Sequence, residues 1–123
     1  WAETWERAWA AHDADAVASL YAEDAAFVSQ PFREPHAGAT GVRAYAEWAF
    51  ESEDSVECRF GEPRASDDGA TVEYWAWINE DGVEQTLAGV ALVRFDGAGK
   101  VVEQRDYWAV ERGRHAPPPG WGR

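Results

Sequence analysis

Three turn sequences divide the second half of the chain into segments that each predict a β-strand. The turns lie at residues 66–69, 79–82 and 96–99, and each holds the Asp and Gly residues that tight turns favour. The predicted strands lie near residues 55–65, 70–79, 84–95 and 100–109. Because strands joined by tight turns pair antiparallel, this half of the chain predicts an antiparallel meander.

The first half of the chain has the spacing of helices. Apolar residues recur three and four positions apart over residues 2–11, 13–21 and 42–51, which predicts three helices, the second capped by Asp13. A short strand at residues 25–29 and a loop at 30–41 separate the last two helices. Helices followed by a meander predict an α+β fold in which the helices pack on one face of the sheet.

Length and composition limit the class of protein. The chain of 123 residues, 46% of them hydrophobic, predicts one domain at residues 1–110, followed by a C-terminal tail at 111–123 that contains proline and arginine. We expect this tail to be extended or mobile, with a reach across to a neighbouring subunit as the alternative. Eight tryptophans are many for this length, so several are expected to line a core or a cavity.

Charge and cysteine content exclude some partners. A formal net charge of −12 disfavours binding to nucleic acid or to an anionic membrane surface. No apolar run approaches the roughly 20 residues of a membrane span. Cys58 is the only cysteine, which excludes an intrachain disulfide and favours a cytoplasmic location. The histidines are scattered, and there is no glycine-rich phosphate loop, so neither a metal nor a cofactor is predicted.

Asp106 is the first candidate for acid–base chemistry. It shares one face of the last predicted strand with Gln104 and Trp108, because side chains alternate across a strand. A carboxylate held beside a large aromatic ring loses hydration, so its pKa rises toward the range of a general base. The alternative interpretation is a solvated acid at the strand end that pairs with a neighbouring Arg.

Four pieces of the sequence resemble a known family in their order and spacing. They are WAAHDADAV at residues 9–17, LYAEDA at 20–25, GVRAY at 41–45, and RFDG at 94–97 followed by RDYW at 105–108. Together they span about residues 2–109 and resemble the SnoaL-like branch of the nuclear-transport-factor-2-like superfamily. The resemblance implies a cone: N-terminal helices packed in the concave face of a curved, mostly antiparallel sheet, around an apolar cavity.

The resemblance also implies a kind of chemistry. The family includes polyketide cyclases, ketosteroid isomerases, limonene epoxide hydrolases and proteins that only bind ligands, and its recurrent device is an acid on the last strands, which Asp106 matches. The epoxide hydrolases add a second acid and an Arg, two residues apart on an earlier strand. The resemblance puts that acid at Glu73 but a threonine, Thr71, at the Arg position, so the acid–Arg–acid arrangement is incomplete.

We expect Asp106 and Glu73 to share one apolar space with Gln104. Two carboxyl groups there cannot both ionise cheaply, so one should hold a proton at neutral pH and give an acid beside a base. The alternative for Glu73 is an ordinary surface acid, and that for Gln104 is a hydrogen-bond partner that orients Asp106.

The same inward faces predict the lining of a substrate-binding cavity. The expected lining residues are Trp75, Trp77, Trp108, Phe27, His36, Tyr45, Cys58, Gly89 and Ala91. Among them, the small Gly89 and Ala91 would leave room for a ligand, His36 would cap the opening from its loop, and Cys58 is expected to be buried and inert.

Three functions fit these observations. The first is a cofactor-free acid–base enzyme of the cyclase, isomerase or hydrolase type, which acts on an apolar substrate with Asp106 as the base, Gln104 as an orienting group and Glu73 as a second acid. The second is a non-catalytic binding protein for an apolar small molecule. The third, a structural or protein-interaction domain, predicts a cone filled by its own tryptophans.

The outer sheet face predicts a homodimer. If Glu73 points inward, the residues expected on the outer face are Val72, Tyr74, Ala76, Ile78, Val90, Leu92 and Tyr107, rimmed by Arg59, Arg94, Glu103 and Arg105. A sheet that is apolar on both faces is uncommon on a soluble monomer, and a two-fold axis is the usual way to bury such a patch.

Overall fold

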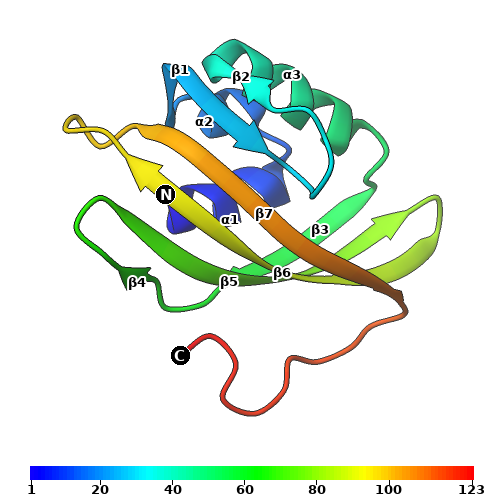
Figure 1. Cartoon of the computed structure of the whole chain (residues 1–123). Coiled ribbons are helices and arrows are strands. Elements are labelled where there is room, and N and C mark those ends of the chain that lie inside the picture. Colours follow the sequence, from blue (N-terminus) through cyan, green and yellow to red (C-terminus); the bar gives the residue numbers. More distant parts are fainter.

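The computed structural model describes residues 1–123 as a curved sheet that wraps around helices (Figure 1). The helices are α1 (Ala2–Ala11), α2 (Ala14–Ala18) and α3 (Gly38–Glu51). The strands are β1 (Tyr21–Val28), β2 (His36–Ala37), β3 (Ser55–Phe60), β4 (Arg64–Ala65), β5 (Gly69–Glu80), β6 (Val83–Phe95) and β7 (Val101–Arg112). The α+β fold predicted from the sequence is therefore confirmed.

The sheet is antiparallel except at one junction. Its strand order is β2-β1-β7-β6-β5-β3, with β4 paired to β5, and only β1 and β7 run parallel. The long hairpin of β5 and β6 closes through Asp81 and Gly82, both at positive φ, as a tight hairpin turn requires. The three helices lie in the concave face, so the predicted cone is confirmed (Figure 1).

The helix boundaries follow local capping and strand pairing. Asp13 caps α2, because its side chain accepts a hydrogen bond of 3.0 Å from the backbone N–H of Ala16. The predicted second helix is too long, since α2 ends at Ala18 and Tyr21 already pairs with Val101 of β7. β1 is consequently longer than the predicted strand at 25–29, and it brings the Tyr21 side chain into the core, where 4% of that residue is exposed.

The two faces of β5 are the reverse of the prediction. Tyr74 pairs with Gly89 of β6 and, with Val72, Ala76 and Ile78, belongs to the buried core on the concave side. Glu73, Trp75 and Trp77 consequently lie on the outer face. Both faces of β5 are apolar because both are covered, and a strand covered on both sides carries no sequence signal of its phase.

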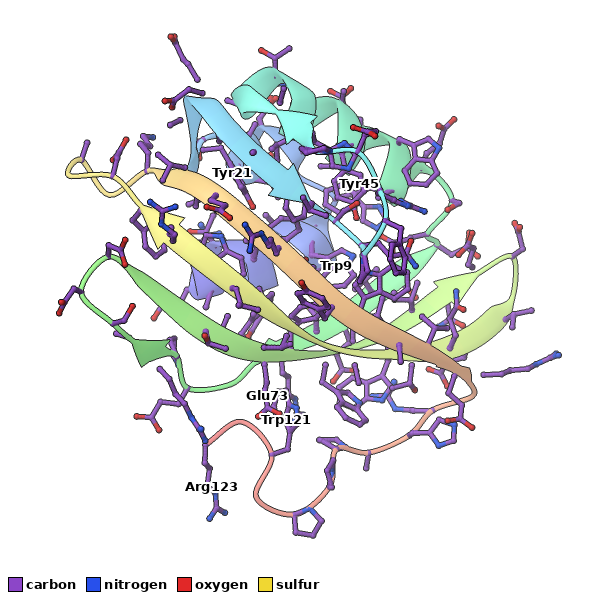
Figure 2. The ribbon with its side chains drawn as sticks, in the orientation of Figure 1. Trp9, Tyr21, Tyr45, Glu73, Trp121 and Arg123 are labelled. Carbon is purple, nitrogen blue, oxygen red and sulfur yellow. The ribbon has the colours of Figure 1, made fainter.

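Residues 113–123 of the C-terminal tail fold back over the outer face of β5. The indole N–H groups of Trp75 and Trp77 both donate to the backbone carbonyl of His115, over 2.9 and 2.8 Å. Trp121 packs edge-on against Trp75, and the N–H of Gly122 donates to Glu73 over 2.9 Å. Figure 2 shows Glu73 and Trp121 together on the side of the sheet away from the helices.

Most of the predicted dimer surface is not available for pairing. Of the expected outer-face residues, those on β5 lie in the core, and the true outer face of β5 is covered by the chain itself. What stays open is a smaller patch on β6 and β7, where Leu92 and Tyr107 are 42% and 48% exposed. No helix of the structure is long and apolar enough to cross a membrane.

Gly89 provides a test of this packing. A Cβ placed there would lie 2.6 Å from the ring carbon Cζ of Tyr74 and 2.7 Å from Cβ of Trp108, so the residue is small to seat Tyr74 rather than a ligand. We expect Gly89→Ala to lower the free energy of unfolding by about 1–3 kcal/mol, the usual range for overpacking. Chemical denaturation measures this loss.

Gly97 supplies the matched control, because a Cβ there would meet nothing within 4 Å and its φ is not positive. Gly97→Ala should leave the unfolding free energy nearly unchanged. Equal effects of the two substitutions would contradict the assignment of Tyr74 to the concave side.

Candidate active site

A cavity of about 850 Å³ lies between the helices and the concave face of the sheet. Of the 23 residues that line it, 15 are hydrophobic, and aromatic side chains from α1, α3 and β7 form much of the wall. The volume and the apolar lining are typical of sites for small organic molecules. The cone is therefore open inside, which contradicts the prediction of a structural domain filled by its own tryptophans.

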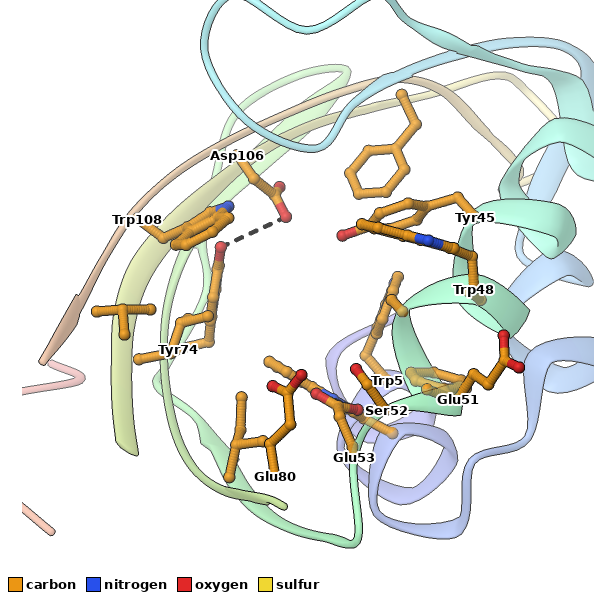
Figure 3. Close-up of a pocket in the computed structure, with 18 of the residues that line it drawn as sticks. Trp5, Tyr45, Trp48, Glu51, Ser52, Glu53, Tyr74, Glu80, Asp106 and Trp108 are labelled. Atoms are coloured by element: carbon orange, nitrogen blue, oxygen red, sulfur yellow. Dashed lines mark hydrogen bonds between the residues drawn. The ribbon is translucent and has the colours of Figure 1, made fainter. Parts of the chain in front are cut away.

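Asp106 projects from β7 into this cavity (Figure 3). The side-chain amide of Gln104 donates to its Oδ1 over 2.9 Å, and the hydroxyl of Tyr74 donates to its Oδ2 over 3.4 Å. Burial raises the pKa of Asp106 to about 7, although both hydrogen bonds favour the ionised form and lower it. The neighbouring Arg105 pairs with Glu103 instead, so the alternative of a solvated, Arg-paired acid is wrong.

Gln104 is fixed in one orientation by a chain of buried donors. The indole of Trp5 donates to the hydroxyl of Tyr21 over 3.1 Å, and that hydroxyl donates to Oε1 of Gln104. Because the amide oxygen is taken, the amide nitrogen must face Asp106. Burial raises the pKa of Tyr21 well above its usual value, so the hydroxyl keeps its proton.

Two tyrosine hydroxyls face the same region. Tyr74 bonds to Asp106 directly, and Figure 3 shows the oxygen of Tyr45 on α3 directed toward the pair across the cavity. Burial raises the pKa of Tyr45 to about 12 and that of Tyr74 above its usual value, and the charge of Asp106 adds to both shifts. Both hydroxyls are therefore hydrogen-bond donors at neutral pH. Sequence reasoning missed Tyr74 because it assigned that residue to the outer face.

The structure puts several predicted residues in or behind the cavity wall. Phe27, Tyr45 and Trp108 line it, and the Trp108 indole is held by a 2.7 Å bond to the carbonyl of Ser29. His36 does not reach the cavity but stacks on Tyr45 from behind, with ring centroids 4.4 Å apart.

The remaining small residues lie in the core rather than in the wall. Gly89 lies beneath Tyr74, and Ala91 is fully buried. Cys58 is buried as well, and its thiol faces the carbonyl of Glu6 at 3.4 Å. Burial raises the pKa of the Cys58 thiol to about 12, which agrees with the expectation of an inert cysteine.

Three predicted site residues do not reach the cavity. Glu73, Trp75 and Trp77 lie on the outer face of β5, where the C-terminal tail binds them. The prediction that they line the cavity is therefore wrong. Its cause is a one-residue error in the phase of β5, which moves every side chain of a strand to the opposite face.

A second acid is present in the cavity, but it is Glu53. Its side chain is 9% exposed and accepts a hydrogen bond of 3.1 Å from the indole of Trp9. Burial raises the pKa of Glu53 to about 7, and the nearby charge of Glu80 raises it further. The sequence gives no signal for it, because Glu53 lies in an acidic turn and its burial depends on a tryptophan 44 positions away. The structure holds no group of three or more His, Cys, Asp or Glu side chains arranged for a metal ion.

Comparisons with known proteins agree with this architecture. The profile of the SnoaL-like domain family matches residues 2–104. Comparison with curated protein sequences gives no match.

Solved structures share the fold at low sequence identity. The epoxide hydrolase/cyclase-like enzyme SalBIII, described in pyran ring formation in the polyether salinomycin, superposes with a TM-score of 0.76 at 16% identity, covering 89% of this chain and 90% of its own. A putative SnoaL-like polyketide cyclase from Shewanella denitrificans gives 0.74 at 15% identity, covering 88% and 87%. A limonene-epoxide-hydrolase-like enzyme from Mycobacterium tuberculosis gives 0.71 at 14% identity, covering 87% and 78%.

These three likenesses show the fold, and the profile match extends over most of the chain. The chain belongs to the SnoaL-like domain family of the nuclear-transport-factor-2-like superfamily.

Proposed function

We propose that the cavity is the active site of a cofactor-free acid–base enzyme that acts on an apolar small molecule, with Asp106 as the general base. The observation that carries this proposal is the Asp106 carboxyl itself, which faces the cavity while Gln104 and Tyr74 hold its two oxygens. A pKa near 7 suits a base that must accept a proton and release it again at neutral pH.

The hydroxyls of Tyr74 and Tyr45 supply the second requirement of such chemistry. When a base removes a proton next to a carbonyl, negative charge develops on the carbonyl oxygen. Hydrogen-bond donors already in position stabilise that charge without reorganisation. The Tyr45 hydroxyl keeps its proton and is directed toward Asp106, so it can donate to a substrate oxygen bound there.

This arrangement favours proton transfer over epoxide hydrolysis. The hydrolase arrangement implied by the resemblance needs an Arg and a second acid on β5 beside Asp106. Thr71 and Glu73 occupy those positions here, and both are exposed, with Glu73 bound to the tail on the outer face. We therefore propose a cyclase or isomerase type of reaction on a substrate with a carbonyl or a similar group.

A non-catalytic binding protein is the second candidate, favoured by the large share of hydrophobic residues in the cavity wall. Binding of an apolar ligand would need the aromatic wall but not the ionisation of Asp106. Native mass spectrometry of protein purified from its host distinguishes the two candidates. A small molecule retained without conversion would favour the binding protein.

One test of the proposed base is Asp106→Asn, which keeps the shape of the side chain and removes the base. We expect the enzyme to catalyse exchange of the α-protons of apolar ketones such as tetralone in D₂O, and Asp106→Asn to slow it by about 10²–10⁴-fold. The wild-type rate should rise as the pH increases through about 7, because only the ionised carboxylate accepts a proton. Proton NMR follows the exchange.

The exposed Asp24 on β1 offers a matched control, since Asp24→Asn makes the same chemical change outside the cavity. Its exchange rate should equal that of the wild type. Exchange that survives Asp106→Asn would overturn Asp106 as the base.

Another prediction for Asp106 concerns stability and needs no substrate. The pKa of Asp106 is raised from 3.8 to about 7 in the folded state, so the folded protein binds this proton more tightly than the unfolded chain does. The resulting stabilisation is complete below the unfolded-state pKa and is lost as the pH rises toward about 7.

Wild-type stability should therefore fall with rising pH over this window, by up to about 1.4 kcal/mol per pH unit from this one group. Asp106→Asn should flatten the fall, whereas Asp24→Asn should not. Denaturant unfolding at a series of pH values measures both slopes, and equal slopes for the two variants would contradict the raised pKa of Asp106.

We also propose that two copies pair through the patch that the tail leaves open on β6 and β7. Leu92 and Tyr107 expose apolar surface there, and the ion pair of Arg94 with Glu103, 2.7 Å long, lies beside them. A two-fold axis through such a patch would bury it against its own copy.

Analytical ultracentrifugation at micromolar concentration tests the proposed dimer. The wild type should sediment as a dimer, and Leu92→Glu should shift it to the monomer, because a charge would be buried in the contact. Val83 is equally exposed at 42% but lies at the β5–β6 turn, so Val83→Glu should leave the dimer intact. A monomeric wild type would refute the proposal.

A further inference from the structure

The cavity is polar at two opposite ends. Asp106 and the tyrosine hydroxyls form one end, and Glu53 and Glu80 lie at the other (Figure 3). Glu53 comes from the turn between α3 and β3, whereas Glu80 ends β5, so the two acids meet only in the folded protein. The mechanism proposed for Asp106 does not use this second end.

Glu53 is largely buried, and the nearest group that could carry a positive charge is His12. Its two carboxyl oxygens share a single donor, the indole N–H of Trp9, at 3.1 and 3.4 Å. His12 Nε2 lies 3.8 Å away, beyond hydrogen-bond distance, and no Lys or Arg lies within 4.0 Å. A carboxylate can accept about four hydrogen bonds, and a charge this deeply buried is normally paired. The protein itself supplies one donor where several would fit.

The wall around Glu53 selects the charge of a ligand. The ionisable groups that line the cavity are the acids Glu51, Glu53, Glu80 and Asp106, the tyrosines, and one cation, Arg33, which lies over the ring of Trp48. An anionic ligand would meet repulsion at both ends of the cavity. A cation would meet carboxyl groups and aromatic faces, to which ammonium groups are attracted.

We propose that the natural ligand is an apolar amine whose protonated nitrogen binds Glu53, while the reacting part of the molecule lies at the far end beside Asp106. The nitrogen would donate to the oxygens that Trp9 leaves open, and its apolar body would lie along the aromatic wall. Only the position of the reacting part beside Asp106 rests on the proposed function, because binding of the nitrogen at Glu53 requires no turnover.

The groups that face Glu53 set the expected pH dependence. They are His12 after α1, Glu80 on β5, and the Tyr45 hydroxyl and Cys58 thiol, which the charge of Glu53 also affects. An alkylamine keeps its proton up to a pH of about 10, as a lysine does. Between a pH of about 6 and 8, the carboxyl of Glu53 loses its proton while the amine keeps its own. The affinity for the amine should therefore rise with pH.

Isothermal titration calorimetry with three probes of matched length tests the proposal on the full chain. The probes are phenylbutylamine, phenylbutanol and phenylbutyrate. The wild type should bind the amine about tenfold more tightly than the alcohol, and the carboxylate most weakly. Glu53→Gln keeps an acceptor for Trp9 and should abolish the preference for the amine, together with its rise with pH, while leaving the affinity for the alcohol unchanged.

Two controls separate the possible explanations. Glu51→Gln removes the same charge from an exposed residue of the same cavity, so it should retain the preference for the amine if Glu53 binds the nitrogen directly. Asp106→Asn should also retain it, even if its ketone exchange is lost. Equal affinity of the wild type for amine and alcohol, or an unchanged amine preference in Glu53→Gln, would overturn the proposal. Ketone exchange that survives Asp106→Asn would overturn the proposed base and leave the amine site standing.

Discussion

The hydrogen bond from Gln104 to Asp106 is the contact on which the site depends. It is the last of a series that starts at Trp5 on α1, passes through Tyr21 on β1 and ends on β7. Tyr21 lies close to Gln104 because β1 pairs with β7, the one parallel junction in the sheet. The orientation of a single carboxyl group therefore depends on the helix layer and on both strands of that junction. A change in any of the three would alter the site without touching Asp106.

Burial raises the pKa of both Asp106 and Glu53, and the two acids lie against different walls of the cavity. Each carboxyl is held by the donors of one wall: an amide and a phenol for Asp106, an indole for Glu53. Neither lies within 4.0 Å of a Lys or Arg side chain, and burial raises the pKa of each to about 7. Strong ion pairs would have fixed both as carboxylates and removed their capacity to exchange protons.

The sequence predicts the helices, the meander and the face of β7 because these segments have a solvated side. On β7 the polar residues of the outer face, Glu103 and Arg105, show which alternate positions turn inward, so Gln104, Asp106 and Trp108 are found. β5 carries no such contrast, and its phase was misassigned. The burial of Glu53 cannot be predicted from the sequence either. In the sequence it resembles the other acids of its turn, and only the fold brings Trp9 against it.

The sheet separates the tryptophans of the chain into two groups. Trp1, Trp5, Trp9, Trp48 and Trp108 line the cavity, whereas Trp75 and Trp77 lie under the C-terminal tail and Trp121 belongs to it. Intrinsic fluorescence of the whole protein therefore combines emission from the cavity wall with emission from the surface beneath the tail. Replacing the three outer indoles by phenylalanine would leave an emission that reports on the cavity, and replacing the five inner ones would leave one that reports on the tail. In this fold the two sides of one sheet can therefore be followed separately by tryptophan fluorescence.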